Sequence, residues 1–155
     1  MHMRLFNEFL TGSDTLRVYQ GENLLFSSTK DRLIPLLDYI ARFGHTYQPP
    51  VVILDKVMGN AAALLSVKAG CGEVYSPLGS QLATKTLDRY GIKYHLTEIV
   101  AFIQNSSGKD MCPMEKLSVD KEPEEFYELM IKLSADREAD GRVRDSQADK
   151  REIVL

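Results

Sequence analysis

The segment NSSGKDMCPMEK, at residues 105–116, places a lone cysteine after a polar, glycine-containing loop. A thiol becomes a nucleophile or a redox group when neighbouring cations favour its thiolate form. Lys109 and Lys116 lie beside Cys112 in the sequence, so this residue is a candidate catalytic thiol. No histidine lies near it in the sequence to act as a base. The groups that a metal-free reaction at this thiol would use are Lys56, Asp55 or Glu115.

The same segment also fits a purely structural role. Met111, Cys112 and Met114 would then fill a hydrophobic gap, since an unpaired cysteine is among the most buried residue types. In this interpretation Pro113 stiffens the turn, and the Glu115–Lys116 pair faces water. The alternatives for Cys112 are therefore a structural residue, a ligand contact or a catalytic thiol.

Metal chemistry has little support in the sequence. The chain has two cysteines, Cys71 and Cys112, which form no C-x-x-C unit, and three scattered histidines, His2, His45 and His95. None of these residues is clustered with the spacing of zinc ligands. We expect two free thiols, no resident metal and no cofactor.

Length and composition favour one domain. The chain has 155 residues, of which 44% are hydrophobic, and a net charge of −3 with a pI of about 5.6. Neither a basic surface for nucleic acid nor a membrane span is expected, and the protein is expected to be cytoplasmic. Eleven of the last 21 residues are charged. We predict a single domain at residues 1–134 and a charged C-terminal extension at 135–155.

Hydrophobic periodicity predicts alternating strands and helices after an initial helix and hairpin. The run VVIL is apolar throughout, as in a strand that is buried on both faces. The order favours an α/β protein: a three-layer α/β/α sandwich with a mixed five-stranded sheet. The expected helices cover residues 3–10, 32–43, 59–69, 77–90, 97–105 and 124–136, and the expected strands cover 15–20, 23–28, 51–54, 73–76 and 92–96.

Three stretches carry a resemblance: DKVMGNAAALL, GEVYSPLGSQLATKTLDRYGI and MCPMEK. They are similar to an uncharacterised bacterial family, domain-of-unknown-function family 1893, over roughly residues 14–133. The order of elements also resembles the cytidine-deaminase-like fold. That fold implies a zinc site where the helix after the third strand and the next helix begin, with deaminases as its enzymes.

The residues that zinc deamination would need are missing. In the frame that the resemblance gives, the metal ligands and the catalytic glutamate would be replaced by Met58, Asn60, Leu78 and Gln81. Leucine cannot ligate a metal, and asparagine does not titrate, so it cannot shuttle protons. The resemblance therefore implies the fold without its zinc chemistry.

What the resemblance leaves is a pocket position, where two helix N-termini converge beyond the carboxyl ends of the strands. Exposed helix-start N–H groups and a lysine there would suit a phosphate or a carboxylate. The candidate residues at this position also have a plain structural explanation, as helix caps or points of close packing. The candidate ligand-binding residues are Asp55, Lys56, Gly59, Asn60, Ser76, Gly79, Ser80, Cys112 and Glu115.

Two functions from different classes follow from these patterns. The first is a non-catalytic binding or regulatory module for a small anionic or nucleotide-like metabolite. The alternative is a metal-free enzyme that uses Cys112 as a nucleophile or redox thiol. Assembly into a homo-oligomer through the helices is expected in either case, because proteins of the deaminase fold commonly form dimers or tetramers.

Overall fold

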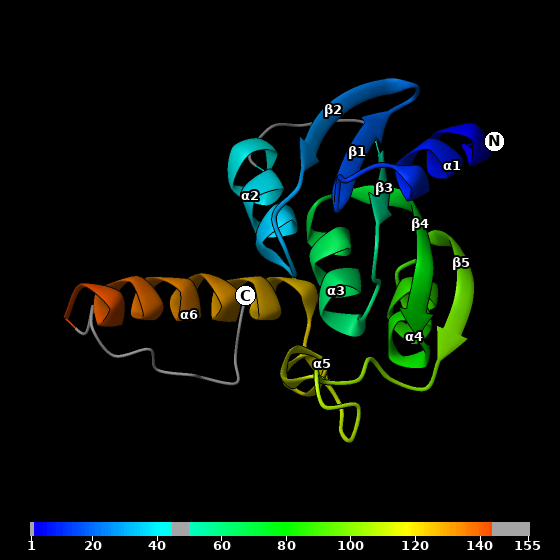
Figure 1. Ribbon diagram of the computed structural model, residues 1–155. Helices are drawn as coiled ribbons and strands as arrows, with labels where there is room; N and C mark the ends of the chain where they lie inside the picture. Colours follow the sequence, from blue (N-terminus) through cyan, green and yellow to red (C-terminus); the bar gives the residue numbers. More distant parts are fainter. Residues whose placement is uncertain (1, 45–49, 144–155) are drawn as a thin grey trace.

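The computed structural model describes residues 2–44 and 50–143, with side chains up to residue 136. Five strands form one mixed sheet in the order β2-β1-β3-β4-β5, in which β1 is antiparallel to β2 and β3, and β3, β4 and β5 are parallel. Figure 1 shows the helices arranged around this sheet. The strands are β1 Leu16–Gln20, β2 Asn23–Ser28, β3 Val51–Asp55, β4 Cys71–Ser80 and β5 Lys93–Val100. The helices are α1 Met3–Thr11, α2 Ile34–Phe43, α3 Asn60–Lys68, α4 Gln81–Arg89, α5 Pro113–Ser118 and α6 Pro123–Val143.

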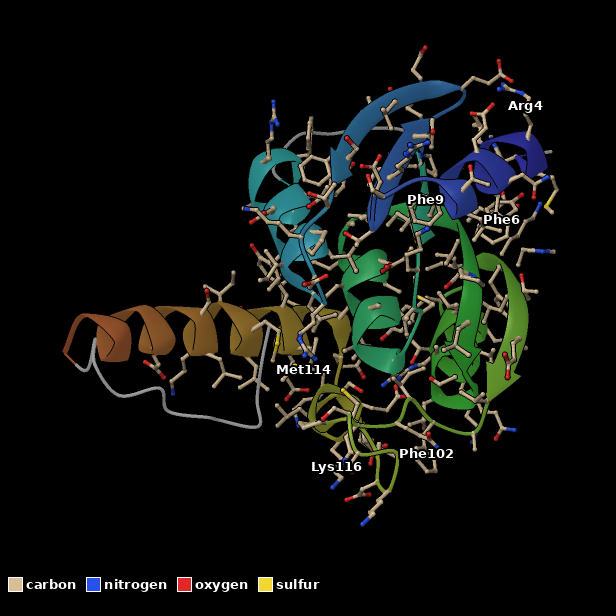
Figure 2. All side chains as sticks on the ribbon, viewed as in Figure 1. Arg4, Phe6, Phe9, Phe102, Met114 and Lys116 are labelled. Atoms are coloured by element: carbon tan, nitrogen blue, oxygen red, sulfur yellow. The ribbon has the colours of Figure 1, made fainter. Side chains whose placement is uncertain are left out.

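The predicted α/β class and mixed five-stranded sheet are confirmed, and helices cover both sheet faces. The central strand β3 is buried along its whole length because its alternate side chains enter two different cores. Val51 and Ile53 join the larger core, which α2, α3, α4 and α6 complete. Val52 and Leu54 join a smaller core closed by α1, whose residues Phe6 and Phe9 point toward the sheet in Figure 2.

Two predicted helix segments, the first residues of the helix at 77–90 and the helix at 97–105, are wrong, and for the same reason. Residues 77–80 were expected to open a helix, but they continue β4, and α4 begins only at Gln81. Residues 97–105 were also expected to be helical, but β5 runs on to Val100. Parallel pairing from Leu78 with Glu98 to Ser80 with Val100 holds both extensions in the sheet. Ladder hydrogen bonds between distant segments have overridden the local helix signals.

The segment after β5 packs against the start of α3. Gln104 and Met111 form an antiparallel bridge, which makes the polar loop between them the tip of a small hairpin. The hairpin leads into α5, a helix that the sequence analysis did not predict. Its companion α6 continues across the predicted domain boundary at residue 134, and in Figure 1 it runs out to the left of the sheet. The domain boundary stays a prediction.

Some residues on which the sequence predictions depend lie outside the described residues. These are His45 in the loop before Pro50, and residues 144–155 of the predicted C-terminal extension. Among the described residues, no helix combines the length and the apolar character that crossing a membrane would require.

Candidate functional site

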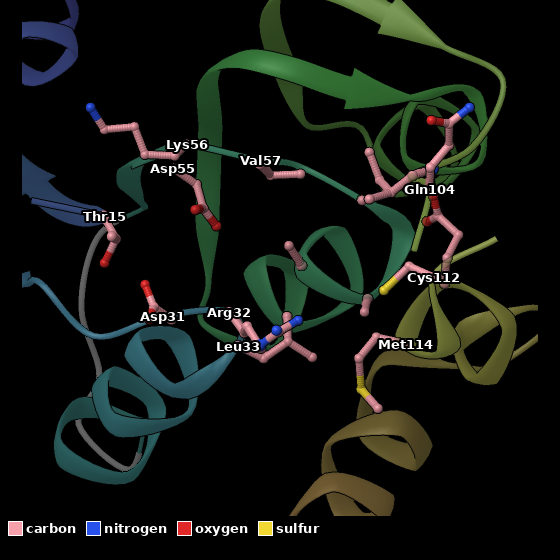
Figure 3. Close-up of a pocket in the computed structure, with 15 residues that line it drawn as sticks. Thr15, Asp31, Arg32, Leu33, Asp55, Lys56, Val57, Gln104, Cys112 and Met114 are labelled. Atoms are coloured by element: carbon pink, nitrogen blue, oxygen red, sulfur yellow. Dashed lines mark hydrogen bonds between the residues drawn. The ribbon is translucent and has the colours of Figure 1, made fainter. Parts of the chain in front are cut away.

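A cavity of about 450 Å³ lies at the carboxyl end of β3. In an α/β sheet this is the end at which ligands usually bind. The antiparallel hairpin contributes to the same edge, because Leu16 at the start of β1 pairs with Asp55 at the end of β3. Figure 3 shows side chains from five segments around this space. The lining comprises Thr15, Asp31, Arg32, Leu33, Asp55, Lys56, Val57, Gly59, Ala61, Ala62, Ile103, Gln104, Cys112, Met114 and Glu115.

Asp55 is a buried carboxyl at the wall of this cavity, only 7% exposed. Burial raises its pKa from the ordinary 3.8 to about 7, although the backbone N–H groups of Val57 and Lys56 partly oppose the shift. Within the described residues, no side chain hydrogen-bonds to this carboxyl or forms an ion pair with it. A buried acid without a cationic partner is costly to keep. Its place at a cavity therefore makes it a candidate functional group.

Glu115 is a second buried carboxyl, only 2% exposed, but its oxygens are engaged. One oxygen accepts the backbone N–H of Asn60 at 2.5 Å and the Ser80 hydroxyl at 3.3 Å. The other accepts the backbone N–H of Ile103 at 2.6 Å. The prediction that Glu115 faces water, made in the structural interpretation of its segment, is wrong. Its carboxylate sits where α3 begins, and the helix dipole favours negative charge there.

The start of α3 is shaped to receive this internal anion. Gly59 is its N-cap, and a Cβ there would come within 3.2 Å of the Glu115 carboxylate and 3.0 Å of Ile103. The absence of a side chain at residue 59 thus permits the contact. Since Glu115 fills the start of α3, this helix end is not available to an external phosphate in the way that the sequence analysis expected.

Asn60 lies beside Glu115 but outside the cavity lining. Its side-chain nitrogen donates to the carbonyl oxygen of Ser118 at 3.1 Å and to the Ser118 hydroxyl at 3.0 Å. Its side-chain oxygen accepts the hydroxyl of Thr86. Asn60 therefore joins α3 to α4 and α5.

Lys56 contributes to the cavity rim, but its ammonium group is used elsewhere. Its Nζ donates to the carbonyl oxygen of Phe9 at 3.0 Å and lies 4.6 Å from the centre of the Phe9 ring. It also reaches the carbonyl of Gly12 at 3.4 Å. The last carbonyls of a helix attract a cation, and Lys56 fills this role for α1. In Figure 3 its side chain points away from the cavity. The ammonium group that was expected to face a bound anion is thus held by the end of α1.

Like Asn60, three further candidates lie outside the cavity lining: Ser76, Gly79 and Ser80. They lie in the last part of β4, where Ser76 bonds to Leu78 and Ser80 caps α4 by accepting the N–H of Ala83 at 3.1 Å. A Cβ at Gly79 would approach Leu96 to 2.5 Å, so this glycine serves close packing with β5.

The two helix starts do lie side by side, as the sequence analysis expected. The Met58 N–H donates to the Leu78 carbonyl at 2.8 Å, and the Ser80 N–H donates back to Met58 at 3.2 Å. Met58 itself is fully buried. The junction is thus packed and bridged by Glu115, and the cavity opens next to it, beside Asp55.

Cys112 lines the cavity together with Asp55, and in Figure 3 its sulfur points into the space. It is partly exposed, whereas Cys71 is buried and its pKa is raised to about 12 by burial. Of the neighbouring lysines, Lys116 is paired with Asp110 at 2.6 Å. The two free thiols of the chain thus differ in access, and only Cys112 faces the cavity.

Arg32 is the site residue that the sequence analysis missed. It lies at the rim, and it is one of two non-glycine residues among those described with a positive φ, here 61°. Within the described residues, no hydrogen bond or ion pair engages its guanidinium. Strained backbone of this kind tends to occur at functional sites. No sequence signal marks it, because SSTKDRLIP reads as a helix start. The segment reaches the cavity because β2, which precedes it, pairs with β1, and β1 pairs with β3.

Comparisons with known proteins place the chain in a family. The family model for the domain of unknown function DUF1893, described as TM1506, matches residues 5–133. The chain belongs to the DUF1893 family. A crystal structure of a DUF1893 family protein (TM1506) from Thermotoga maritima is similar to it, with a TM-score of 0.68 and 25% sequence identity, covering 84% of this chain and 85% of that one. No curated protein matches the chain significantly.

For this DUF1893 protein the family resemblance predicted from the sequence is confirmed. The cytidine-deaminase-like fold is not named by either match and stays a prediction. In the described part of the chain, no group of three or more His, Cys, Asp or Glu side chains is arranged to hold a metal ion.

Proposed function

We propose that this DUF1893 protein is a small-molecule binding or regulatory module, and that its ligand, an anionic or nucleotide-like metabolite, occupies the cavity at the end of β3. The observation that carries the proposal is a buried carboxyl without a side-chain partner, Asp55, in the wall of a cavity of about 450 Å³. Sites for small ligands are mostly apolar concavities of roughly 300–1,000 Å³ with a few polar groups that fix orientation. Arg32 and Cys112 supply further polar groups here.

The anionic part of the proposal rests on Arg32 alone. Lys56 caps α1, and the start of α3 is occupied by Glu115. A ligand with only a negative charge would meet one cation and the acids Asp31 and Asp55. These surroundings favour a nucleotide-like molecule with an uncharged polar part over a simple anion.

A thermal-shift screen of the full chain tests the proposal. The probes are ribonucleosides, their 5′-monophosphates and phosphorylated sugars. A ligand at 100 times its Kd stabilises a protein by about 2.7 kcal/mol, which raises Tm by roughly 5–10 °C in a domain of this size. Val57→Trp places a bulky side chain at the cavity and should abolish the shift. The control is Val119→Trp, an exposed position outside the cavity lining, which should preserve it. No shift with any probe, or equal loss in both variants, would refute the proposal.

The alternative function is a metal-free enzyme that uses Cys112 as a nucleophile or redox thiol. The observation that favours it is that Cys112 and Asp55 share one cavity, since a carboxyl with a pKa of about 7 can exchange protons at neutral pH. Cys71 provides an internal control, because it is buried. The alternative expects iodoacetamide to modify Cys112 in the folded protein much faster than Cys71. Reaction of Cys112 only after denaturation would exclude it.

A further inference from the structure

Asp55 and Arg32 are charged side chains of opposite sign at the cavity, and neither has a side-chain partner within the described residues; the exposed Asp31 next to Arg32 has none either. Asp55 is 93% buried in the wall, by its exposed fraction of 7%, and Arg32 is exposed at the rim. Both point into the same space in Figure 3. The rest of the lining is mixed: Leu33, Ala62 and Met114 are apolar, whereas Thr15, Gln104 and Cys112 are polar. The cavity therefore has a buried carboxyl in its wall and an exposed guanidinium at its rim, with apolar and uncharged polar groups in the rest of the lining.

The other titratable groups around the cavity form no hydrogen bond or ion pair with Asp55 or Arg32 within the described residues. Glu115, from α5, accepts three hydrogen bonds from Asn60, Ser80 and Ile103. Lys56, after β3, donates to the end of α1. Asp31, before α2, is exposed, and Cys112, before α5, is a partly exposed free cysteine.

From this arrangement we propose that the ligand is two-ended: N–H donors at one end bind the Asp55 carboxylate, and an anionic group at the other end binds the Arg32 guanidinium. This inference rests on the proposed function and specifies its ligand class. A carboxylate is an acceptor only and suits paired N–H donors, whereas a guanidinium forms two parallel bonds with phosphate or carboxylate. Nucleoside 5′-monophosphates, with base N–H groups and a phosphate separated by a sugar, have this chemistry and a matching size.

The backbone at Arg32 supports its assignment. A residue other than glycine that adopts the left-handed conformation costs of order 1–2 kcal/mol. Such strain persists where the surrounding structure or a function requires it. Glycine would remove the strain at residue 32 but would also remove the guanidinium. The strained arginine is thus explained if its side chain serves a ligand.

Proton linkage gives the inference a second readout. N–H donors require the ionised form of Asp55, whose pKa in the free protein is about 7. Binding should therefore release a proton, and affinity should rise about tenfold between pH 6 and pH 8. The phosphate of a nucleotide also titrates near pH 6, so Asp55→Asn is needed to assign the effect, because only the Asp55 contribution disappears in that variant.

The experiment is isothermal titration calorimetry of the full chain with the four ribonucleoside 5′-monophosphates, the matching nucleosides and inorganic phosphate. We expect at least one monophosphate to bind, its nucleoside and inorganic phosphate to bind at least tenfold more weakly, and Asp55→Asn and Arg32→Ala each to weaken binding at least tenfold. Asp136→Asn, at an exposed aspartate, is the control and should bind as wild type does.

The outcomes separate the inference from the proposed function. If a probe binds but its affinity is unchanged in Asp55→Asn or falls between pH 6 and pH 8, the donor assignment is overturned while the proposed function stands. If nucleoside and monophosphate bind equally, the Arg32 assignment is overturned. If no probe binds, the proposed nucleotide-like ligand and the inference both fail. Folding of each variant is checked by its thermal unfolding, so that lost binding is not confused with lost structure.

Discussion

Asp55 and Glu115 are two buried carboxyl groups at one cavity, and they differ in the number of hydrogen-bond donors that surround them. Glu115 accepts bonds from Asn60, Ser80 and Ile103, so it joins α5 to the starts of α3 and α4 and to the segment after β5. Asp55 has only neighbouring backbone N–H groups, and its pKa is raised to about 7 by burial. Burial alone thus does not mark a functional carboxyl. The number of donors that meet it separates a structural acid from an available one.

Removing Glu115 should have the largest effect on stability. Glu115→Ala leaves two backbone N–H groups and a hydroxyl without their acceptor, and we expect a loss of about 3 kcal/mol or more in the free energy of unfolding. Glu115→Gln keeps one acceptor oxygen and should lose less. Urea denaturation measures both. Glu128→Gln, at an exposed glutamate, is the control. A loss in Glu115→Ala no larger than in the control would remove the distinction between the two carboxyls.

Replacing Asp55 should raise the free energy of unfolding, in contrast to replacing Glu115, and the effect should be largest above neutral pH. Its folded-state pKa of about 7 lies above the ordinary 3.8, so the folded protein binds this proton more tightly than the unfolded chain does. Its contribution to stability is therefore present at low pH and is lost as pH rises from about 4 to about 7. Asp55→Asn should gain about 3 kcal/mol relative to wild type between pH 5 and pH 8, measured by urea denaturation at each pH. If the difference in free energy of unfolding between Asp55→Asn and wild type does not change with pH, Asp55 has a partner that stabilises its carboxylate.

Lys56 tests whether such a partner exists nearby. Lys56→Met removes the bonds to the Phe9 and Gly12 carbonyls and the contact with the Phe9 ring. We expect a loss of about 1–2 kcal/mol through weaker docking of α1, with the same pH window for Asp55 as in wild type. Thermal unfolding across pH 5–8 measures both. If the Asp55 window instead moves to higher pH in Lys56→Met, the lysine is stabilising that carboxylate.

Arg32 offers the smallest and most specific comparison. Arg32→Gly and Arg32→Ala both remove the guanidinium, but only glycine relieves the positive φ of 61°. Arg32→Gly should be more stable than Arg32→Ala by about 1 kcal/mol. Denaturant midpoints of the two variants, with Arg32→Lys as the variant that keeps charge and strain, measure this difference. Equal stability of the glycine and alanine variants would contradict a left-handed residue 32.

The sequence by itself determined the class of fold and the edge where the cavity lies. The apolar run at 51–54 fixed a strand buried on both faces, and the alternation around it fixed an α/β sheet. Asp55 and Cys112, which both line the cavity, were candidates from their positions alone, one at a strand end and the other in an unusual segment. These features are local, because side-chain pattern and chain connectivity decide them.

Only the tertiary structure decided what each polar residue does. The ladder between β4 and β5 turned two expected helix segments into strand, and it took Gly79 and Ser80 into the sheet. The end of α1 took the ammonium of Lys56, and Glu115 reached the start of α3 across 55 residues of sequence. Pairing of β1 with both β2 and β3 brought Arg32 to the cavity. The energy of a buried charge depends on which groups surround it in space, and sequence order does not give that information.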